Sequence, residues 1–305
     1  MRADDRHAVT ALCAQMWDGH DYIPQVFDDW LAHPRGQFTA VIDDDHDTLI
    51  GVGKLTSITE RDWWIEGLRV ELSYRGKGVG RRLHAYHVDL WQQLSPPASS
   101  LRLLTDHDNH IIQRFSEQAG FRLLGEVVPY RAEAIHAPHS FLKSDTVDFS
   151  LVERSHYYQT HQHLYQTQTL WRWAELTPQA LSQREVWLWR EGRGLIIVEA
   201  ATADNPLNVP CVFVDFVGAA EAELVECLKE VRGLAASLNH SEIGVGIMSS
   251  DSILIEAFIA AGYSPAWTEE SLFRRWCMNL DQQQNLMQNQ GYAQNQTNNE
   301  TSNQA

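Results

Sequence analysis

The residues best suited to chemistry in this sequence form a run of glycines and cations, Arg75-Gly76-Lys77-Gly78-Val79-Gly80-Arg81. Glycines let a backbone approach a ligand closely, and the N-terminus of a helix favours negative charge. The apolar spacing over residues 79–94 predicts a helix that begins within this run. The run is therefore either an anion-binding turn or, on charge alone, a solvated basic helix face.

Two better-known phosphate motifs fit this run poorly. The Walker pattern requires Ser or Thr after Gly-Lys, but Gly78 follows Lys77. The dinucleotide fingerprint requires glycines in the order G-x-G-x-x-G, whereas the glycines here alternate with single residues. A strand predicted over residues 63–70 directly precedes the run, and this position strengthens the prediction of a phosphate site.

The charge of the whole chain limits which partners are plausible. The sequence has 40 acidic and 24 basic residues, a formal net charge of −16, which argues against nucleic acid and anionic membranes as partners. The basic cluster Arg69, Arg75, Lys77, Arg81 and Arg82 stands out against this background and suits a small polyanion such as a nucleotide cofactor. No apolar run reaches the roughly 18 residues of a membrane span, and the N-terminus does not resemble a secretory signal, so we expect a cytoplasmic protein.

Hydrophobic periodicity and turn residues predict an α/β protein. The expected helices are 7–17, 23–32, 79–94 and 111–119, and the expected strands are 38–42, 49–55, 63–70, 101–105 and 121–130. The later segment 109–121 aligns without gaps to 251–263, and both copies end in Ala-Gly and an aromatic residue. A strand at 212–217, a helix at 220–238 and a strand at 242–247 precede the second copy, which favours a tandem of two related units.

These patterns divide the chain into three parts. We expect a first domain over residues 1–140, a second α/β lobe over 145–280, and a disordered Gln/Asn-rich tail over 281–305. The four cysteines, Cys13, Cys211, Cys227 and Cys277, lie far apart and are predicted to be buried free thiols. The histidines His156, His161 and His163 lie in a polar stretch and are predicted to be at the surface.

The strand Glu66-Gly67-Leu68-Arg69-Val70, the glycine run and the later stretch from Asn109 to Gly120-Phe121 resemble the GNAT superfamily of acyl-CoA N-acyltransferases. The resemblance covers about residues 5 to 130. It implies a GNAT fold, a mixed and partly splayed sheet flanked by helices, with acetyl-CoA as co-substrate and no metal. The second unit would be a degenerate GNAT-like lobe without its own CoA motif, because Gly218-Ala219-Ala220-Glu221 lacks a basic glycine turn.

The resemblance also implies positions for the cofactor. The pantetheine would bond to the backbone of Leu68, Arg69 and Val70, between two splayed parallel strands. The pyrophosphate would lie on Arg75, Gly76, Lys77, Gly78, Val79, Gly80 and Arg81, and Asn109 would begin the later helix of the site.

Catalysis needs a group that takes the proton of the substrate amine. Glu66 is the candidate base, acting directly or through water; the alternative is a strand-end glutamate paired with an arginine. The backbone N–H of Leu68 or Val70 would polarise the thioester carbonyl by family analogy. Ser116 occupies the position where the family often has a tyrosine that protonates the leaving thiolate, and serine is shorter.

Asp21 and Tyr22 lie between the first two predicted helices, in the segment that lines the acceptor pocket in this superfamily. Asp21 would bind a substrate ammonium or cap the next helix, and Trp64 would line the pocket or pack in the core. Short motifs, Asp21-Tyr22-Ile23-Pro24 and Trp30-Leu31, are similar to the histidine N-acetyltransferase-like branch. This likeness predicts a small-molecule amine acceptor, best a free amino acid such as histidine. An aminoglycoside, a polyamine or a protein amine is an alternative, as is a non-catalytic CoA-binding sensor or scaffold.

Overall fold

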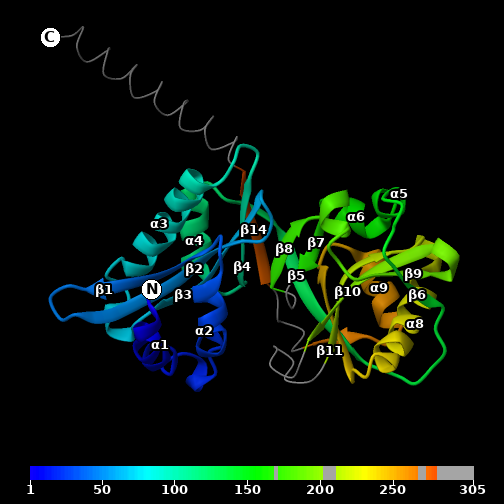
Figure 1. Cartoon of the computed structure of the whole chain (residues 1–305), viewed down its shortest axis with the longest axis horizontal. Coiled ribbons are helices and arrows are strands. Elements are labelled where there is room, and N and C mark those ends of the chain that lie inside the picture. The colour runs from blue at the N-terminus through cyan, green and yellow to red at the C-terminus, as the bar shows by residue number, and fades with distance from the viewer. Residues whose placement is uncertain (168–170, 202–210, 267–272, 280–305) are drawn as a thin grey trace, which may run out of the picture. The chain divides into compact units, whose positions relative to one another are not determined.

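The computed structural model describes residues 1–167, 171–201, 211–266 and 273–279, so the predicted tail over 281–305 lies outside the described residues. The chain forms two compact units (Figure 1). Unit 1 comprises Met1–Leu103, His110–Arg122 and, among the described residues, 276–279. Unit 2 comprises Leu104–Asn109 and Leu123–Arg275.

Unit 1 is built on a mixed sheet. Its strands are β1 (Gln37–Asp43), β2 (Thr48–Ser57), β3 (Asp62–Val70) and β4 (Ser100–Asp106), and Trp276–Asn279 of β14 (Phe273–Asn279) lies beside β4. The strands β1, β2 and β3 are antiparallel neighbours, and β4 runs parallel to β3. The parallel pairing covers Asp62–Trp64 against Ser100–Arg102 only, so the two strands separate beyond these residues.

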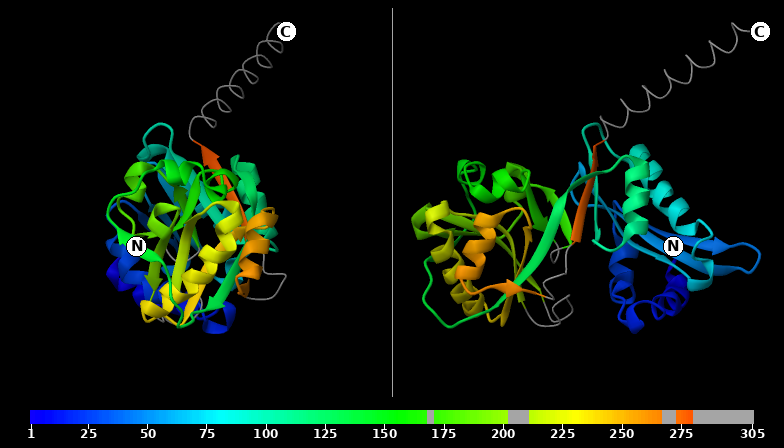
Figure 2. Two further views of the ribbon diagram at one scale, coloured as in Figure 1. Left: turned by 90° about the vertical axis from the view of Figure 1, so that its right-hand side faces the viewer. Right: turned by 180° about the vertical axis from the view of Figure 1, so that it is seen from behind.

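Helices cover both faces of this sheet (Figure 2). They are α1 (Arg6–Cys13), α2 (Ile23–Ala32), α3 (Val79–Leu94) and α4 (His110–Ala119). Successive residues of β2 point to opposite faces. Val52 therefore joins the apolar cluster with Phe27 of α2, and Leu55 joins the cluster with Trp91 of α3. The two cores fix β3 between the helix pairs.

Unit 2 contains a second mixed sheet in the order β5-β12-β11-β10-β9-β6, with β13 beside β5. Its strands are β5 (Arg122–Glu133), β6 (Phe141–Ser144), β9 (Val186–Trp189), β10 (Gly194–Ala201), β11 (Cys211–Gly218), β12 (Glu242–Met248) and β13 (Ser264–Pro265). The strands β11 and β12 are parallel, and the other pairs are antiparallel. As in unit 1, one parallel pair follows a series of antiparallel strands.

Among its described residues, unit 2 also has a separate hairpin, five α-helices and two short 3-10 helices. The hairpin is β7 (Leu164–Thr167) and β8 (Arg172–Glu175), and the helices are α5 (Ser150–Glu153), α6 (His156–Thr160), α7 (Pro178–Leu181), α8 (Leu224–Ser237) and α9 (Ser252–Ala260). α8 packs against β12 and α9, whereas α6 and β7 contact β11. The mixed α/β fold predicted from the sequence is confirmed, and a second α/β unit follows the first, as predicted.

Several boundaries differ from the sequence predictions. The first helix ends at Cys13 rather than at residue 17, and α8 begins at Leu224 after a short turn rather than at residue 220. All four cysteines are buried and free, as predicted. Within the described ranges, no helix is long and apolar enough to cross a membrane.

Candidate active site

The strand β3 carries a bulge where it begins to separate from β4. Between the pairs Val52–Arg69 and Lys54–Glu66, β3 contributes two residues and β2 only one. One of the two is Gly67, which has a positive φ of 65°. An added Cβ there would lie 2.3 Å from Cη2 of Trp30, so the indole of α2 packs directly on the bulge. Only glycine combines this backbone conformation with so close an approach.

Glu66 lies immediately before the bulge and is partly exposed. The hydroxyl of Thr56 on β2 donates a hydrogen bond to its Oε1 at 2.5 Å. Lys54, its register partner on β2, is fully buried and donates from Nζ to the carbonyl oxygen of Trp30 at 2.6 Å. Glu66 is therefore a carboxylate in a fixed position that solvent and a substrate can reach.

The glycine run forms the turn between β3 and α3. Gly76 and Gly78 have φ values of 77° and 84°, and nothing lies within 4 Å of a Cβ added to either residue. Gly78 is the N-cap of α3, whose first backbone N–H groups have no intrahelical acceptor. Open backbone at a helix N-terminus fits a pyrophosphate.

The preceding turn is held by side chains. The hydroxyl of Tyr74 donates to Asp43 on the β1–β2 hairpin, and the Glu71 carboxylate accepts from the backbone N–H of Ser73 at 2.8 Å. The Lys77 ammonium lies 4.6 Å from the centre of the Tyr74 ring. These contacts fix the turn before any ligand reaches it.

The other cations of the run are at its surface. Arg75 donates from Nε to the carbonyl oxygen of Val70 at 3.4 Å, and its Nη2 lies 3.1 Å from the Met16 sulfur. Arg81 and Arg82 are exposed on the first turns of α3. The loop therefore combines open N–H groups with accessible positive charge, which fits the cofactor implied by the sequence.

Asp21 is placed differently from the substrate ligand predicted as one of its two roles. It is buried, and both of its oxygens accept hydrogen bonds from Arg69, at 2.7 and 3.2 Å. Its Oδ1 also accepts from the backbone N–H of Ile23 at 3.2 Å, at the start of α2. This geometry favours the alternative role as a cap. Arg69 in turn donates to the carbonyl oxygen of Leu68 at 3.1 Å, beside the bulge.

The remaining predicted site residues differ in their exposure. Tyr22 is 45% exposed, and its ring lies 5.7 Å from the Arg69 guanidinium, so it can meet a substrate. Trp64 is buried, which favours core packing over lining a pocket. Asn109 is exposed directly before α4, and its N–H donates to the Asp106 carbonyl oxygen at 3.0 Å.

Ser116 is fully buried in α4, and its hydroxyl donates to the carbonyl oxygen of Ile112 at 2.9 Å. This back-bond within a helix is a common resting place for a serine hydroxyl. The structure therefore gives no support to Ser116 as the acid that protonates a leaving thiolate.

Two histidines of α3 were not anticipated as buried groups. His84 lies 5.6 Å from the ring of Phe121, and burial lowers its pKa to about 4. Burial also lowers the pKa of His87 to about 3, and its Nε2 is 3.0 Å from the Thr39 hydroxyl. Both are neutral at pH 7. Their spacing places both histidines on the apolar face of the predicted helix, and this could have predicted their burial.

A group of residues that could hold a metal ion lies at the end of β4, apart from the bulge of β3 and the glycine turn. The ligand atoms of Asp106, His107 and Asp108 are within 4.8 Å of one another, but the two carboxylates are largely exposed. Exposed acidic groups of this kind are common without an ion. The cluster adds no chemistry to the site on β3.

Residues 7–121 match the sequence model described as the acetyltransferase (GNAT) family. The chain has the GNAT fold. A search of curated protein sequences found no significant match.

Solved structures show the same architecture over both units. A GCN5-related N-acetyltransferase from Sphaerobacter thermophilus is 13% identical, with a TM-score of 0.59 over 92% of this chain and 94% of that chain. A fungal multi-domain GH3 β-N-acetylglucosaminidase contains a GCN5-related glucosamine N-acetyltransferase region; it is 15% identical, with a TM-score of 0.60 over 91% and 37%. A tandem GNAT protein from the clavulanic acid biosynthesis pathway is 12% identical, with a TM-score of 0.50 over 92% and 96%. At these identities the likeness concerns the fold.

Proposed function

We propose that the protein is an N-acetyltransferase that moves the acetyl group of acetyl-CoA to the amine of a small molecule. One observation carries the proposal: Glu66 stands at the bulge where β3 separates from β4, and the same strand leads into an open glycine turn at the N-terminus of α3. A carboxylate and an open turn that suits a phosphate therefore lie at opposite ends of one short stretch of backbone.

The residues of unit 1 would share the work as follows. The turn from Arg75 to Arg81 binds the pyrophosphate, and the backbone of Leu68–Val70 aligns the pantetheine. Glu66 takes a proton from the substrate ammonium, directly or through water, so that the amine nitrogen can attack the thioester carbonyl carbon. The N–H of Leu68 or Val70 stabilises the oxyanion. The carbon–sulfur bond then breaks, and the CoA thiolate leaves and takes a proton from water.

For the acceptor, we propose the α-amine of a free amino acid such as histidine. The exposed ring of Tyr22 and the carboxylate of Glu66 suit an aromatic or heterocyclic side chain and an ammonium group respectively. A polyamine, an aminoglycoside or a protein amine is the alternative, because the acidic chain attracts any cation.

A thiol-release assay with acetyl-CoA and a panel of amino acids, polyamines, aminoglycosides and lysine peptides tests this proposal. Glu66→Gln should lower kcat/KM for the accepted amine by roughly 10²- to 10⁴-fold, because a general base is lost. Its affinity for acetyl-CoA should stay within about twofold. Glu60→Gln, an exposed glutamate in the preceding turn, serves as the matched control and should change neither quantity.

A second candidate function is a CoA-binding sensor or scaffold. The buried Ser116 favours it, because the hydroxyl in the family's general-acid position is bonded within its own helix to the carbonyl oxygen of Ile112. Measurable binding of acetyl-CoA with no thiol release for any acceptor of the panel would support the sensor and contradict the enzyme.

A further inference from the structure

Unit 2 contains the same separation of parallel strands that forms the proposed cofactor site in unit 1. The strands β11 and β12 pair only over Cys211–Phe213 and Glu242–Gly244. Beyond this point β11 continues to Gly218 and β12 to Met248. Backbone groups of β12 that face the separation have lost their strand partner, and buried N–H and C=O groups must find another.

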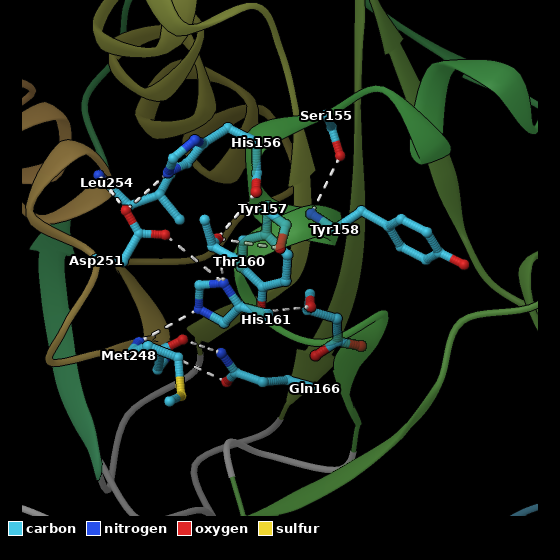
Figure 3. Close-up of polar contacts among 12 residues, drawn as sticks. Ser155, His156, Tyr157, Tyr158, Thr160, His161, Gln166, Met248, Asp251 and Leu254 are labelled. Atoms are coloured by element: carbon cyan, nitrogen blue, oxygen red, sulfur yellow. Dashed lines mark hydrogen bonds and ion pairs between the residues drawn. The ribbon is translucent and has the colours of Figure 1, made fainter. Parts of the chain in front are cut away.

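Side chains from the preceding segment supply those partners (Figure 3). The N–H of Gly246 donates to Oε1 of Gln166 at 3.0 Å, and Nε2 of Gln166 donates back to the Gly246 carbonyl oxygen. Two residues further along β12, the N–H of Met248 donates to Nε2 of His161 at 3.2 Å. The carboxamide of Gln166 thus bonds to β12 as a peptide or a pantetheine amide would.

Tyr157 bonds to β11, the other strand of the parallel pair. Its hydroxyl donates to the carbonyl oxygen of Asp215 on β11 at 3.4 Å, and its ring stacks on His161 with centroids 3.9 Å apart. The ring of Trp173 on β8 is almost parallel to that of His161, with centroids 5.9 Å apart, and the Arg275 guanidinium lies 4.6 Å from the centre of the Trp173 ring. All these side chains are fully buried, so the separation is filled rather than open.

The same residues do not form a catalytic centre. Nδ1 of His161 lies 3.1 Å from Oγ1 of Thr160 and 3.9 Å from Oδ2 of Asp251. A hydroxyl, an imidazole and a carboxylate thus lie close together, as in a catalytic triad. However, His161 Nε2 already accepts the Met248 N–H, so it cannot also take a proton from a substrate. Burial lowers the pKa of His161 to about 3 and raises that of Tyr157, so both are neutral in the filled separation.

Two further features of unit 2 oppose cofactor binding. The turn after β11 has Glu221 and Glu223 where unit 1 has cations, which would repel a pyrophosphate. Asp215 stands two residues beyond the last parallel pair, as Glu66 does in unit 1, but it is fully buried and bonded to Arg184.

We propose that unit 2 is a self-occupied GNAT lobe, in which Tyr157, His161 and Gln166 fill the place of a pantetheine arm, so that unit 2 binds no acyl-CoA of its own. The side chains of α6 and β7 act as an internal ligand that completes the hydrogen bonds of β12 and closes the lobe. This inference concerns the fold of unit 2 and goes beyond the proposed function of unit 1.

Amide hydrogen exchange of the full chain tests the internal ligand without any cofactor. The amides of Gly246 and Met248 should be protected to the same degree as paired amides of β12. Gln166→Met should speed exchange at Gly246 roughly threefold to tenfold, the loss of one hydrogen bond, with little change at Met248. His161→Phe should show the reverse pattern.

Each variant is the control of the other, and Gln179→Met, an exposed glutamine of α7, should change neither amide. Unprotected amides at Gly246 and Met248 in the wild type would overturn the proposal even if both variants failed to fold. An unchanged Gly246 amide in a folded Gln166→Met variant would also overturn it.

Calorimetric titration with acetyl-CoA tests the consequence. The wild type and Gln166→Met should each bind one acetyl-CoA per chain, and Arg75→Ala/Lys77→Ala/Arg81→Ala should bind none that is measurable. Two sites per chain, or one site retained in the triple variant, would place a cofactor in unit 2 and overturn the proposal. A wild type that binds none, with Gly246 and Met248 protected, would contradict the proposed function and still support a self-occupied lobe.

Discussion

Units 1 and 2 have the same arrangement of strands, but they differ in the residues at the place where their two parallel strands separate. In both units a parallel pair of three residues ends where one strand bulges, at Gly67 in β3 and at Asp215 in β11. Unit 1 continues into an open glycine turn with cations, whereas unit 2 continues into an acidic turn. The fold supplies a place for a ligand, and the local sequence decides whether a cofactor or the protein's own side chains occupy it.

The two carboxylates at this point make the same contrast. Glu66 is partly exposed beside a threonine hydroxyl, which leaves it able to exchange protons with a substrate. Asp215 is fully buried, and burial raises its pKa although Arg184 opposes the shift. A carboxylate at one register position can therefore serve chemistry in one unit and structure in the other.

Charge reversal in the turn of unit 1 should have the largest effect, because it makes that turn resemble the acidic turn of unit 2. Lys77→Glu/Arg81→Glu should weaken acetyl-CoA binding roughly a thousandfold, since two charged hydrogen bonds of about 2 kcal/mol each are lost. Lys143→Glu/Lys229→Glu, an equal change of charge at exposed positions of unit 2, is the control. Calorimetry should show weaker acetyl-CoA binding in the turn variant and unchanged binding in the control. A similar loss of affinity in both double variants would mean that the turn is not the phosphate site.

Removal of Asp215 should lower stability and leave activity unchanged, whereas removal of Glu66 should do the reverse. Asp215→Ala leaves Arg184 with Glu199 as its remaining carboxylate partner and should cost about 2 kcal/mol of unfolding free energy, with kcat/KM nearly unchanged. Glu66→Gln should lower kcat/KM and leave stability nearly unchanged. Denaturant titration and steady-state kinetics on both variants measure the contrast. A large loss of activity in a folded Asp215→Ala variant would contradict the structural role.

The sequence predicts the strand, the turn and the helix that carry the candidate site of unit 1, because the signals for these elements are local. The glycine turn, the helix that follows it and Glu66 lie within residues 63–94, where spacing and residue type determine the structure. His161 shows the opposite case. Its segment looks polar and was predicted to be at the surface, but it is fully buried, because its partner Met248 lies far along the chain. The prediction for His161 was wrong for that reason. Asp21 is a similar case, because its hydrogen-bond partner Arg69 lies far from it in the sequence.

Acid should destabilise both units through their buried histidines. Burial lowers the pKa of His84 to about 4 and that of His161 to about 3, whereas an unfolded histidine titrates near 6.5. The unfolded chain therefore binds more protons below about pH 6.5, and stability falls as the pH falls toward the folded pKa values. Between pH 7 and pH 5, each such histidine should contribute a loss of about 2 kcal/mol.

Variants assign this loss to the units. Denaturant titration of His84→Leu at pH 7 and pH 5 should show a smaller loss than the wild type in the transition of unit 1. His161→Phe should do the same in unit 2, and substitution of the exposed His163 by Gln should not. An equal loss in His84→Leu and the wild type would mean that this histidine is protonated in the folded protein.

The smallest expected effect concerns how the turn of unit 1 is held before a cofactor binds. Tyr74→Phe removes the hydrogen bond to Asp43 but keeps the ring beneath Lys77. The loss of one such bond, about 1 kcal/mol, should raise the KM for acetyl-CoA roughly fivefold and leave kcat within about twofold. Tyr86→Phe, an exposed tyrosine of α3, is the matched control. If Tyr74→Phe lowers kcat and leaves KM unchanged, the hydroxyl acts on the reaction rather than on the turn. An unchanged Tyr74→Phe variant would show that the glycines and the helix N-terminus suffice to hold the turn of unit 1.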